Sequence, residues 1–260
     1  MTKTNAVFTE CTVFGRRRQI ILRIFVAGVR PLALLLTFAC LSASMMFAQN
    51  CAPPSAFVDA PHPAIDAPER LVSHTEEIVI NRSLPIVLSA VDKPIKDTIH
   101  KSGSLPGVSG EYLLTKAEFG TPGSRRITCL SDGTTLEEEV LGSEHNEKSS
   151  RFRYIVWNYT TEKARPISYG IGDFLYTDMG DRRTHITWLY SFKLREDKFP
   201  GNFGAIGRFL FRVRFLDKDY AALMRDVLNG YKTDAEQRPA DDDNPGRVRN
   251  PPLRPTDEYN

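Results

Sequence analysis

The sequence has few cysteines and little net charge. Among its 260 residues there are 4 cysteines, and 34 Lys and Arg side chains nearly balance 32 Asp and Glu side chains, for a formal net charge of +2. Four cysteines are too few for a scaffold built on disulfides. A composition of 41% apolar and 25% charged residues excludes a wholly disordered or fibrous chain. The length suits one domain with a full core, or two small ones.

The small net charge hides a difference between the start of the chain and the rest. Residues 1–48 contain six basic side chains and one acidic one, a balance of +5, whereas the remainder carries a balance of −3. A domain without a net positive charge lacks the general electrostatic attraction by which proteins bind polyanions such as nucleic acids. No nucleic-acid partner is therefore expected.

The motifs of several large enzyme classes are also missing. The sequence has no Gly-x-Ser-x-Gly elbow, no phosphate-binding loop, no dinucleotide fingerprint and no His-Glu-x-x-His. Its five histidines are scattered, without ligand spacing on one element. They are His62, His74, His100, His145 and His185. The sequence predicts no metal site and no cofactor.

The chain does have a basic segment followed by an apolar one at its start. Five arginines precede a stretch from Pro31 to Val58 that contains no charged residue. This order is typical of a signal peptide, and the apolar run is also long enough to remain as a spanning helix, which needs about 20 residues. Arginines on the N-terminal side favour export of the rest of the chain. We expect residues 1–48 to be a signal peptide or a membrane anchor, with the body secreted, periplasmic or anchored outside the cytoplasm.

Proline-rich segments flank the central part of the chain. Residues 49–74 contain five prolines and show no clear period, which is typical of a semi-extended linker. Residues 236–260 combine prolines with Asp241-Asp242-Asp243, the composition of a disordered tail. The sequence therefore predicts a single folded domain over residues 75–235.

Cleavage of a signal peptide would leave two cysteines, Cys51 and Cys129. An oxidising compartment allows such residues to pair. Because Cys51 lies in the predicted linker and Cys129 in a predicted strand, we expect two unpaired thiols.

Alternating apolar and polar residues predict strands within the domain. A strand over residues 75–81 and a short helix over 84–91 come first. Six strand-like runs come next, over residues 111–119, 124–131, 134–141, 151–159, 167–177 and 184–195. Asp132-Gly133 is a strong hairpin motif, and the short spacings leave no room for crossover helices. We expect an antiparallel sheet of about seven strands.

The period changes to three and four residues after Pro200-Gly201. The apolar side chains that recur at these steps are Phe209, Val213, Leu216, Tyr220, Leu223, Val227 and Tyr231. They predict an amphipathic helix over residues 203–230. As the one long helix expected, it has to cover the apolar face of the sheet, which makes the fold α+β. A strongly curved sheet then leaves a cavity beside the helix.

This order of elements resembles the SRPBCC superfamily, and more narrowly the polyketide cyclase/dehydrase and lipid-transport branch of START-like domains. The motifs that carry the resemblance are Gly123-Ser124-Arg125-Arg126, Asp132-Gly133, Glu138, Arg153-Tyr154, Pro166 and Trp188-Leu189-Tyr190-Ser191-Phe192. The likeness covers about residues 75–232. It implies a helix-grip fold with a deep, mostly apolar pocket for a lipid, polyketide, sterol or hormone-like ligand. Activities vary widely within the superfamily, so the resemblance fixes no reaction.

Side chains on the last strand and the long helix are candidates for the pocket wall. Trp188, Tyr190 and Phe192 share one face of their strand by parity, and they are either core or pocket lining. The polar tips of Trp188 and Tyr190 need a partner when buried, which a ligand oxygen would supply. The predicted ligand-binding residues are Arg126, Glu138, Tyr154, Trp188, Tyr190, Phe192, Phe209, Val213 and Tyr220.

Glu138 is the one carboxylate expected on the apolar side of the sheet, because it shares a strand face with Leu136 and Val140. A buried carboxylate must be paired or protonated. Arg126 or Arg153 is the nearest plausible partner. Glu138 is then either half of a buried ion pair or a polar clamp at the bottom of the pocket, and it is the only candidate for acid/base catalysis.

Three functions fit these observations. The first is an exported or membrane-anchored carrier that holds a hydrophobic small molecule or lipid. The second is a cyclase or dehydratase-like enzyme with Glu138, Arg126 and Tyr154 or Tyr190 as acid/base and anchoring groups. The third is a structural domain whose cavity is filled by its own side chains. The first is favoured, because no complete catalytic set is present and polyketide chemistry normally takes place in the cytoplasm.

Overall fold

The computed structural model describes residues 51–239. The expected signal peptide or anchor at 1–48 and most of the expected tail at 236–260 lie outside this range. Within residues 51–239, no helix is both long enough and apolar enough to cross a bilayer.

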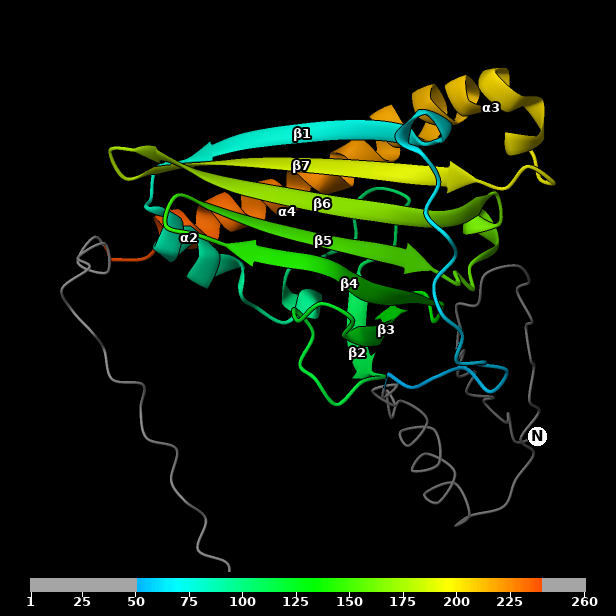
Figure 1. The fold of residues 1–260 in the computed structure, drawn as a ribbon, viewed down its shortest axis with the longest axis horizontal. Helices are drawn as coiled ribbons and strands as arrows, with labels where there is room; N and C mark the ends of the chain where they lie inside the picture. The colour runs from blue at the N-terminus through cyan, green and yellow to red at the C-terminus, as the bar shows by residue number, and fades with distance from the viewer. Residues whose placement is uncertain (1–50, 240–260) are drawn as a thin grey trace, which may run out of the picture. The chain divides into compact units, whose positions relative to one another are not determined.

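Seven antiparallel strands form one sheet in the order β1-β7-β6-β5-β4-β3-β2 (Figure 1). The strands are β1 (Val72–Ile80), β2 (Val108–Leu113), β3 (Arg125–Leu130), β4 (Thr135–His145), β5 (Ser149–Trp157), β6 (Ile167–Gly180) and β7 (Arg183–Leu194). From β2 to β7 each strand pairs with the next in the chain, and β1 pairs with β7 at the far edge. The predicted seven-stranded antiparallel sheet is confirmed.

The strands begin and end within about four residues of the bounds predicted from the sequence, except at the end of β2. Gly133 has a φ of +83° in the turn between β3 and β4, as expected for the Asp132-Gly133 hairpin. The run predicted over 111–119 is shorter, because β2 ends at Leu113. Beyond it the chain turns, and the Phe119 ring lies 3.6 Å under the Arg126 guanidinium instead of continuing the strand.

A long C-terminal helix covers one face of the sheet. It begins as α3 (Gly204–Phe211), continues as a π-helical stretch η5 (Arg212–Tyr220) and ends as α4 (Ala221–Glu236). It is therefore longer than the predicted helix, and Gly230 does not end it. The short helix α2 (Leu84–Val91) packs against α4. In Figure 1 the orange α4 runs behind the sheet, nearly along the strands.

The main core lies between the sheet and these helices. Alternate residues of β7 point into it, as the parity of the sequence predicted. They are Ile186, Trp188, Tyr190, Phe192 and Leu194, each less than 5% exposed. From the helix side Met224, Val227 and Leu228 complete this core. The α+β helix-grip architecture is thus confirmed from the strand order and the position of the helix.

Residues 51–71 cross the opposite face of the sheet, and we call them the strap (Figure 1). Apart from the short turn η1 (Pro68–Arg70), the strap has no helix or strand. It covers a second, smaller core that includes Trp157 and Tyr169. Asp66 in the strap accepts hydrogen bonds from the Tyr169 hydroxyl and the Lys193 ammonium. The Pro-rich segment is therefore extended, as expected, and is also held against the sheet.

A disulfide fixes the start of the strap, which corrects the expectation of two unpaired thiols. Cys51 and Cys129 are bonded, with their Cα atoms 5.6 Å apart. The prediction was wrong because it treated the linker as leading away from the domain. The strap instead folds back over the sheet and brings Cys51 to β3.

Candidate functional site

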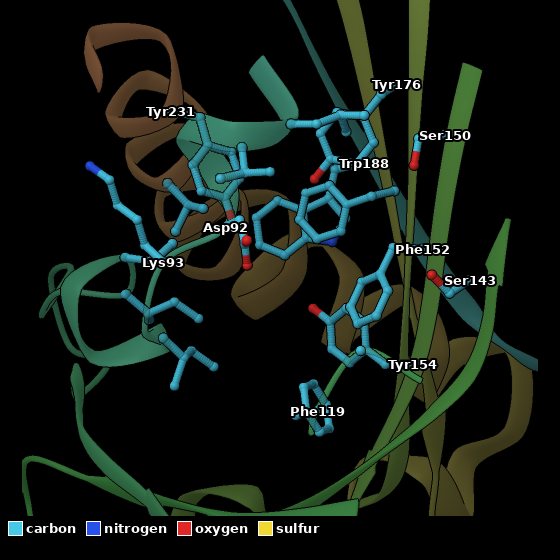
Figure 2. A pocket seen from close by; sticks show the side chains of 18 of the residues that line it. Asp92, Lys93, Phe119, Ser143, Ser150, Phe152, Tyr154, Tyr176, Trp188 and Tyr231 are labelled. Carbon is cyan, nitrogen blue, oxygen red and sulfur yellow. The ribbon is translucent and has the colours of Figure 1, made fainter. Parts of the chain in front are cut away.

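The sheet and the helices enclose a hollow with two adjoining compartments. The larger compartment has a volume of about 330 Å³ and lies between the inner strand faces, α2 and α4 (Figure 2). The smaller compartment, of about 150 Å³, extends beneath η5. Glu138, Tyr154 and Trp188 line both compartments. Ligand pockets typically measure about 300–1,000 Å³, so the hollow is large enough for a small organic ligand.

Aromatic side chains line the sheet side of the larger compartment. Phe174 stacks on Trp188 with 4.4 Å between ring centroids, and Phe152 stacks on Tyr154 at 5.6 Å. These rings come from inward positions of three neighbouring strands, so they form one continuous surface. Tyr231 of α4 faces them across the cavity (Figure 2). Such a surface favours a flat or elongated apolar ligand.

Two glycines of β6 allow the tyrosine rings to lie flat against the sheet. A Cβ at Gly172 would collide with the Tyr154 ring, and one at Gly170 would lie 2.7 Å from the Tyr190 hydroxyl. The ladder with β5 is regular at these glycines, and the neighbouring Asp173 binds Arg151 on the outer face. The glycine spacing therefore marks a close approach of side chains.

An ion pair forms the polar floor of the cavity. Arg126 Nε donates to Glu138 Oε2 at 2.5 Å, and Arg126 Nη1 donates to Glu111 at 2.7 Å. Thr128 donates to the same Glu138 oxygen at 3.1 Å. Burial alone would lower the pKa of Arg126, but the two carboxylates outweigh it and raise that pKa. Of the two partners proposed for Glu138, the structure selects Arg126.

The cavity also contains polar groups that the protein leaves without a partner. Trp188 Nε1 is buried and has no hydrogen-bond partner among residues 51–239. The Tyr154 hydroxyl points into the cavity (Figure 2) and makes no hydrogen bond with another described residue. Burial raises the pKa of Tyr154 well above its usual range, so the hydroxyl stays protonated and available as a donor. A buried donor without a partner costs about 1–3 kcal/mol, which a ligand oxygen would recover.

Most of the predicted ligand-binding residues lie at this cavity. Arg126, Glu138, Tyr154 and Trp188 line the larger compartment. Tyr190, Phe192 and Tyr220 line the smaller one. Burial raises the pKa of Tyr190 and of Tyr220 well above the usual range as well. The placement of these seven residues at one hollow agrees with the sequence-based expectation.

Phe209 and Val213 do not lie at the cavity, although the sequence analysis placed them there. Phe209 is 63% exposed and Val213 is 43% exposed, whereas Phe211 and Leu216 are buried. The prediction assumed one α-helical period throughout. Since a π-helical turn contains more residues than an α-helical one, η5 rotates the apolar stripe. The stripe before η5 consequently faces away from the sheet.

Sequence analysis missed several wall residues. They are Phe119, Phe152, Phe174, Tyr176 and Tyr231. Phe174 and Tyr176 share a face of β6 with the two glycines, so parity would have found them. Phe119 lies in a turn rather than in the predicted strand, and no local pattern places it beneath Arg126.

Chemically, the arrangement suits binding better than proton transfer. Arg126 and Thr128 both donate to Glu138 Oε2, which fixes the carboxylate in place, and no histidine within residues 51–239 lines either compartment as a second acid/base group. Among the described residues no cluster of His, Cys, Asp and Glu side chains is arranged to hold a metal ion.

A sheet wrapped on a long C-terminal helix, with a cavity between them, defines the helix-grip class. No family model and no curated protein matches the chain. The solved structures similar to it include Ara h 8.0201, at 10% identity and a TM-score of 0.45 over 65% of this chain and 99% of that one. They also include the Zhui aromatase/cyclase from Streptomyces sp. R1128, at 11% identity and a TM-score of 0.45 over 65% of this chain and 95% of that one.

A third similar structure is the di-domain aromatase/cyclase StfQ of the steffimycin biosynthetic pathway. It has 13% identity and a TM-score of 0.47, over 66% of this chain and 53% of that one. Because identities and TM-scores this low say nothing about activity, the fold assignment stands on the strand order and helix position described above.

Proposed function

We propose that this protein is an exported or membrane-anchored carrier that holds a hydrophobic small molecule or lipid between the sheet and α4. The observation that carries the proposal is the aromatic cavity of about 330 Å³ in which Trp188 Nε1 is buried without a partner. A domain that filled its cavity with its own side chains would have no reason to leave this donor unpaired.

The lining defines the chemistry of the ligand. Apolar and aromatic walls select an apolar body, and Trp188 Nε1 calls for one hydrogen-bond acceptor on that body. The Tyr154 hydroxyl offers a second polar contact from the same, sheet-side wall (Figure 2). The ligand is thus a mostly hydrophobic molecule with a carbonyl, hydroxyl or ether oxygen near its middle.

The ion pair on the floor favours a carrier over an enzyme. Arg126 is held between Glu138 and Glu111 by an ion pair on each side, so its charge is engaged by the protein rather than offered to a substrate. No histidine in the described part of the chain lines either compartment. The cyclase or dehydratase alternative therefore has Glu138 as a candidate carboxylate but no histidine from that part of the chain beside it to complete an acid/base pair.

Two observations support export. The Cys51–Cys129 disulfide is of the kind that persists in oxidising compartments and is rare in reducing ones. The basic and then apolar order of residues 1–48 is typical of an export signal or anchor. They come from different parts of the chain and point to the same compartment.

Native mass spectrometry of the protein purified from the cells that make it tests the proposal. We expect a discrete bound mass that solvent extraction identifies as a hydrophobic molecule. Ser143→Trp should abolish it, because Ser143 lines the larger compartment and an indole would fill the space. Glu144→Trp is the matched control, since Glu144 is the next residue of β4, pairs with Arg151 rather than Phe152, and lines neither compartment. A protein that remains empty after incubation with a lipid extract of its host would overturn the carrier.

A further inference from the structure

The α3 end of the long helix carries exposed apolar side chains in unusual number. Phe199, Phe203, Ile206 and Phe209 are each 58–67% exposed, and Val213 is 43% exposed. We call these five residues the α3 patch. Isolated exposed apolar residues are normal, but a contiguous group of large ones marks an interaction site.

These side chains gather at the start of the long helix. Ile206 and Phe209 lie three residues apart in α3, which places them on one side of that helix, and Val213 follows near the start of η5. Phe203 ends the preceding turn η4 (Gly201–Phe203), and the Phe199 ring lies beside it with 5.9 Å between the two ring centroids. In Figure 1, α3 lies beyond the end of β7, away from the cavity-covering part of the helix. The α3 patch thus faces outward.

The turn before α3 holds this orientation in place. A Cβ at Gly207 would collide with the Pro200 carbonyl oxygen, so the first turn of α3 packs directly on the preceding loop. Gly207 and Phe211 are the buried residues of α3. The helix consequently presents the side with Gly207 and Phe211 to the protein and the side with Ile206 and Phe209 to the surroundings.

The charges around the α3 patch are of one sign. Between Phe199 and Leu216 there are three arginines and no acidic residue. Arg208 and Arg214 form no ion pair with any residue in the described range. Arg212 reaches only Asp217, which lies just beyond the patch. Unpaired arginines beside an apolar stripe are the pattern by which amphipathic helices bind anionic lipid surfaces.

We propose that the α3 patch docks on a membrane surface that contains anionic lipids. The apolar side chains would enter the boundary between headgroups and acyl chains, while Arg208, Arg212 and Arg214 contact lipid phosphates. The proposal does not depend on the carrier function, because it rests on a surface outside the cavity. A protein partner or a second copy of this chain would cover the same apolar side chains but would not need anionic lipid.

Quenching of a tryptophan placed in the patch tests the docking locally. The full chain with Phe209→Trp is mixed with vesicles whose acyl chains carry bromine, a quencher of indole fluorescence. Vesicles of phosphatidylcholine alone are compared with vesicles that also contain phosphatidylglycerol. Because the readout is confined to residue 209, membrane binding by any other segment does not imitate it. Trp157 and Trp188 are buried and contribute the same background to every variant.

We expect strong quenching of Phe209→Trp on vesicles with phosphatidylglycerol. Leu189→Trp is the matched control, because Leu189 is also exposed, at 38%, but lies on the outer face of β7. Adding Arg208→Glu and Arg214→Glu should weaken the anionic-vesicle binding that this quenching reports at least tenfold, since each basic residue near such a surface contributes about 1 kcal/mol.

Three results would overturn the proposal. The first is quenching of Phe209→Trp no stronger than that of Leu189→Trp. The second is quenching that ignores phosphatidylglycerol and the two arginine substitutions. The third is a residue 209 indole that is shielded without any vesicles and in proportion to protein concentration, which would assign the α3 patch to contact between copies of the chain.

Discussion

Consecutive residues of β3 and β4 build two similar ion pairs on opposite faces of the sheet. Arg126 pairs with Glu138 on the cavity side, and Arg125 pairs with Glu137 on the strap side, at 2.5 and 2.8 Å. The strand register places Arg126 directly opposite Glu138, whereas Arg125 is opposite Glu139 and reaches Glu137 diagonally. The sequence around the two pairs is nearly the same, so their surroundings decide what they do.

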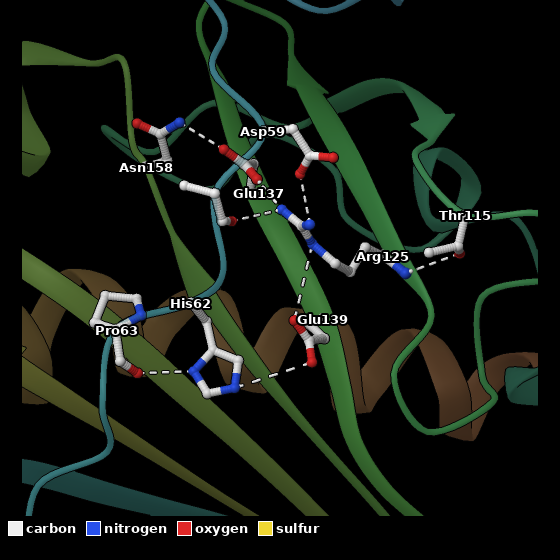
Figure 3. Close-up of polar contacts among 9 residues, drawn as sticks. Asp59, His62, Pro63, Thr115, Arg125, Glu137, Glu139 and Asn158 are labelled. Atoms are coloured by element: carbon white, nitrogen blue, oxygen red, sulfur yellow. Dashed lines mark hydrogen bonds and ion pairs between the residues drawn. The ribbon is translucent and has the colours of Figure 1, made fainter.

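On the strap side the pair is completed by the protein itself. Asp59 and the Ala60 carbonyl of the strap accept hydrogen bonds from Arg125, and Asn158 donates to Glu137 (Figure 3). The Trp157 ring lies 5.3 Å from the guanidinium. His62 and Glu139 extend the network at 3.9 Å. The strap thus closes this face with groups from the same chain.

On the cavity side no such closure exists. The Arg126–Glu138 pair is satisfied, but the indole Nε1 of Trp188 and the Tyr154 hydroxyl have no protein partner among residues 51–239. On the strap side Arg125 Nε also lacks a hydrogen bond, but it lies 3.8 Å from the Glu139 carboxylate. On the cavity side these two donors have neither a hydrogen bond nor an ion pair with the described residues. We therefore expect a ligand on the cavity side, and substitutions on each face of the sheet can test this difference.

Loss of the disulfide should cause the largest drop in the free energy of unfolding, because the bond holds the strap to the sheet. Cys129→Ser removes a bond that links residues 78 positions apart. Constraints on loops of this length stabilise a protein by about 4 kcal/mol in the chain-entropy model. Chemical denaturation with and without reductant measures the loss. Reductant should destabilise the unsubstituted protein and leave Cys129→Ser unchanged, and equal sensitivity of both would contradict the assignment.

Breaking the ion pair on the cavity side should cost more stability than breaking the one on the strap side. Glu138→Gln leaves the Arg126 charge buried with Glu111 as its remaining acidic partner, and we expect a loss of about 3 kcal/mol. Glu137→Gln should cost only about 1 kcal/mol, because Asp59 and Glu139 still surround Arg125. Denaturant unfolding of both variants measures the difference. Equal losses would show that the strap contributes nothing to the outer pair.

Two hydroxyl deletions should give opposite results. Tyr169→Phe removes the hydrogen bonds that join Tyr169 to Asp66 of the strap, so stability should fall by about 1.5 kcal/mol without a change in ligand affinity. Tyr154→Phe removes a hydroxyl without a protein partner, so affinity for the extracted ligand should fall about fivefold with little loss of stability. Calorimetric titration and thermal unfolding together measure both effects. Identical profiles for the two variants would contradict the division between the faces.

The smallest expected effect is a pH dependence of the strap. Burial raises the pKa of Asp66, but hydrogen bonds from Lys193 and Tyr169 outweigh burial and lower that pKa below its ordinary value of 3.8. A lowered folded-state pKa stabilises the fold above the ordinary value, and this contribution is lost as the pH falls through the folded-state pKa.

Asp66→Asn is the variant that isolates this contribution. It should be less stable than the unsubstituted protein at neutral pH, and the gap should close below about pH 3. Unfolding measured across this range checks the direction. A gap that widens in acid would contradict the role given to Lys193.

The alternation of residues along the strands correctly predicted which side chains lie on the inner face of the sheet. The parity of β7 placed Trp188, Tyr190 and Phe192 on the inner face, and the parity of β4 placed Glu138 there too, with its partner left open between Arg126, which the structure shows, and Arg153. Both depend only on alternation along a strand and on its immediate neighbours, which a sequence records directly.

Other features depend on contacts that a linear pattern does not contain. The disulfide requires the strap to fold back across the sheet, and only tertiary packing decides that. The π-helical stretch η5 shifts the phase of a stripe that looks regular in the sequence. That shift explains why Phe209 and Val213 leave the core while Phe211 and Leu216 enter it.

The Cys51–Cys129 bond also decides where tension on the domain would act. A pull on the chain ahead of Cys51 meets the disulfide first and is delivered to β3, next to the β2 edge. Without the bond the same pull would reach β1, the edge strand at the opposite side, after the strap had come away. Since β1 is held to the sheet by β7 alone, it could then be peeled off one hydrogen bond at a time. The covalent link thus shields the most vulnerable strand from mechanical load.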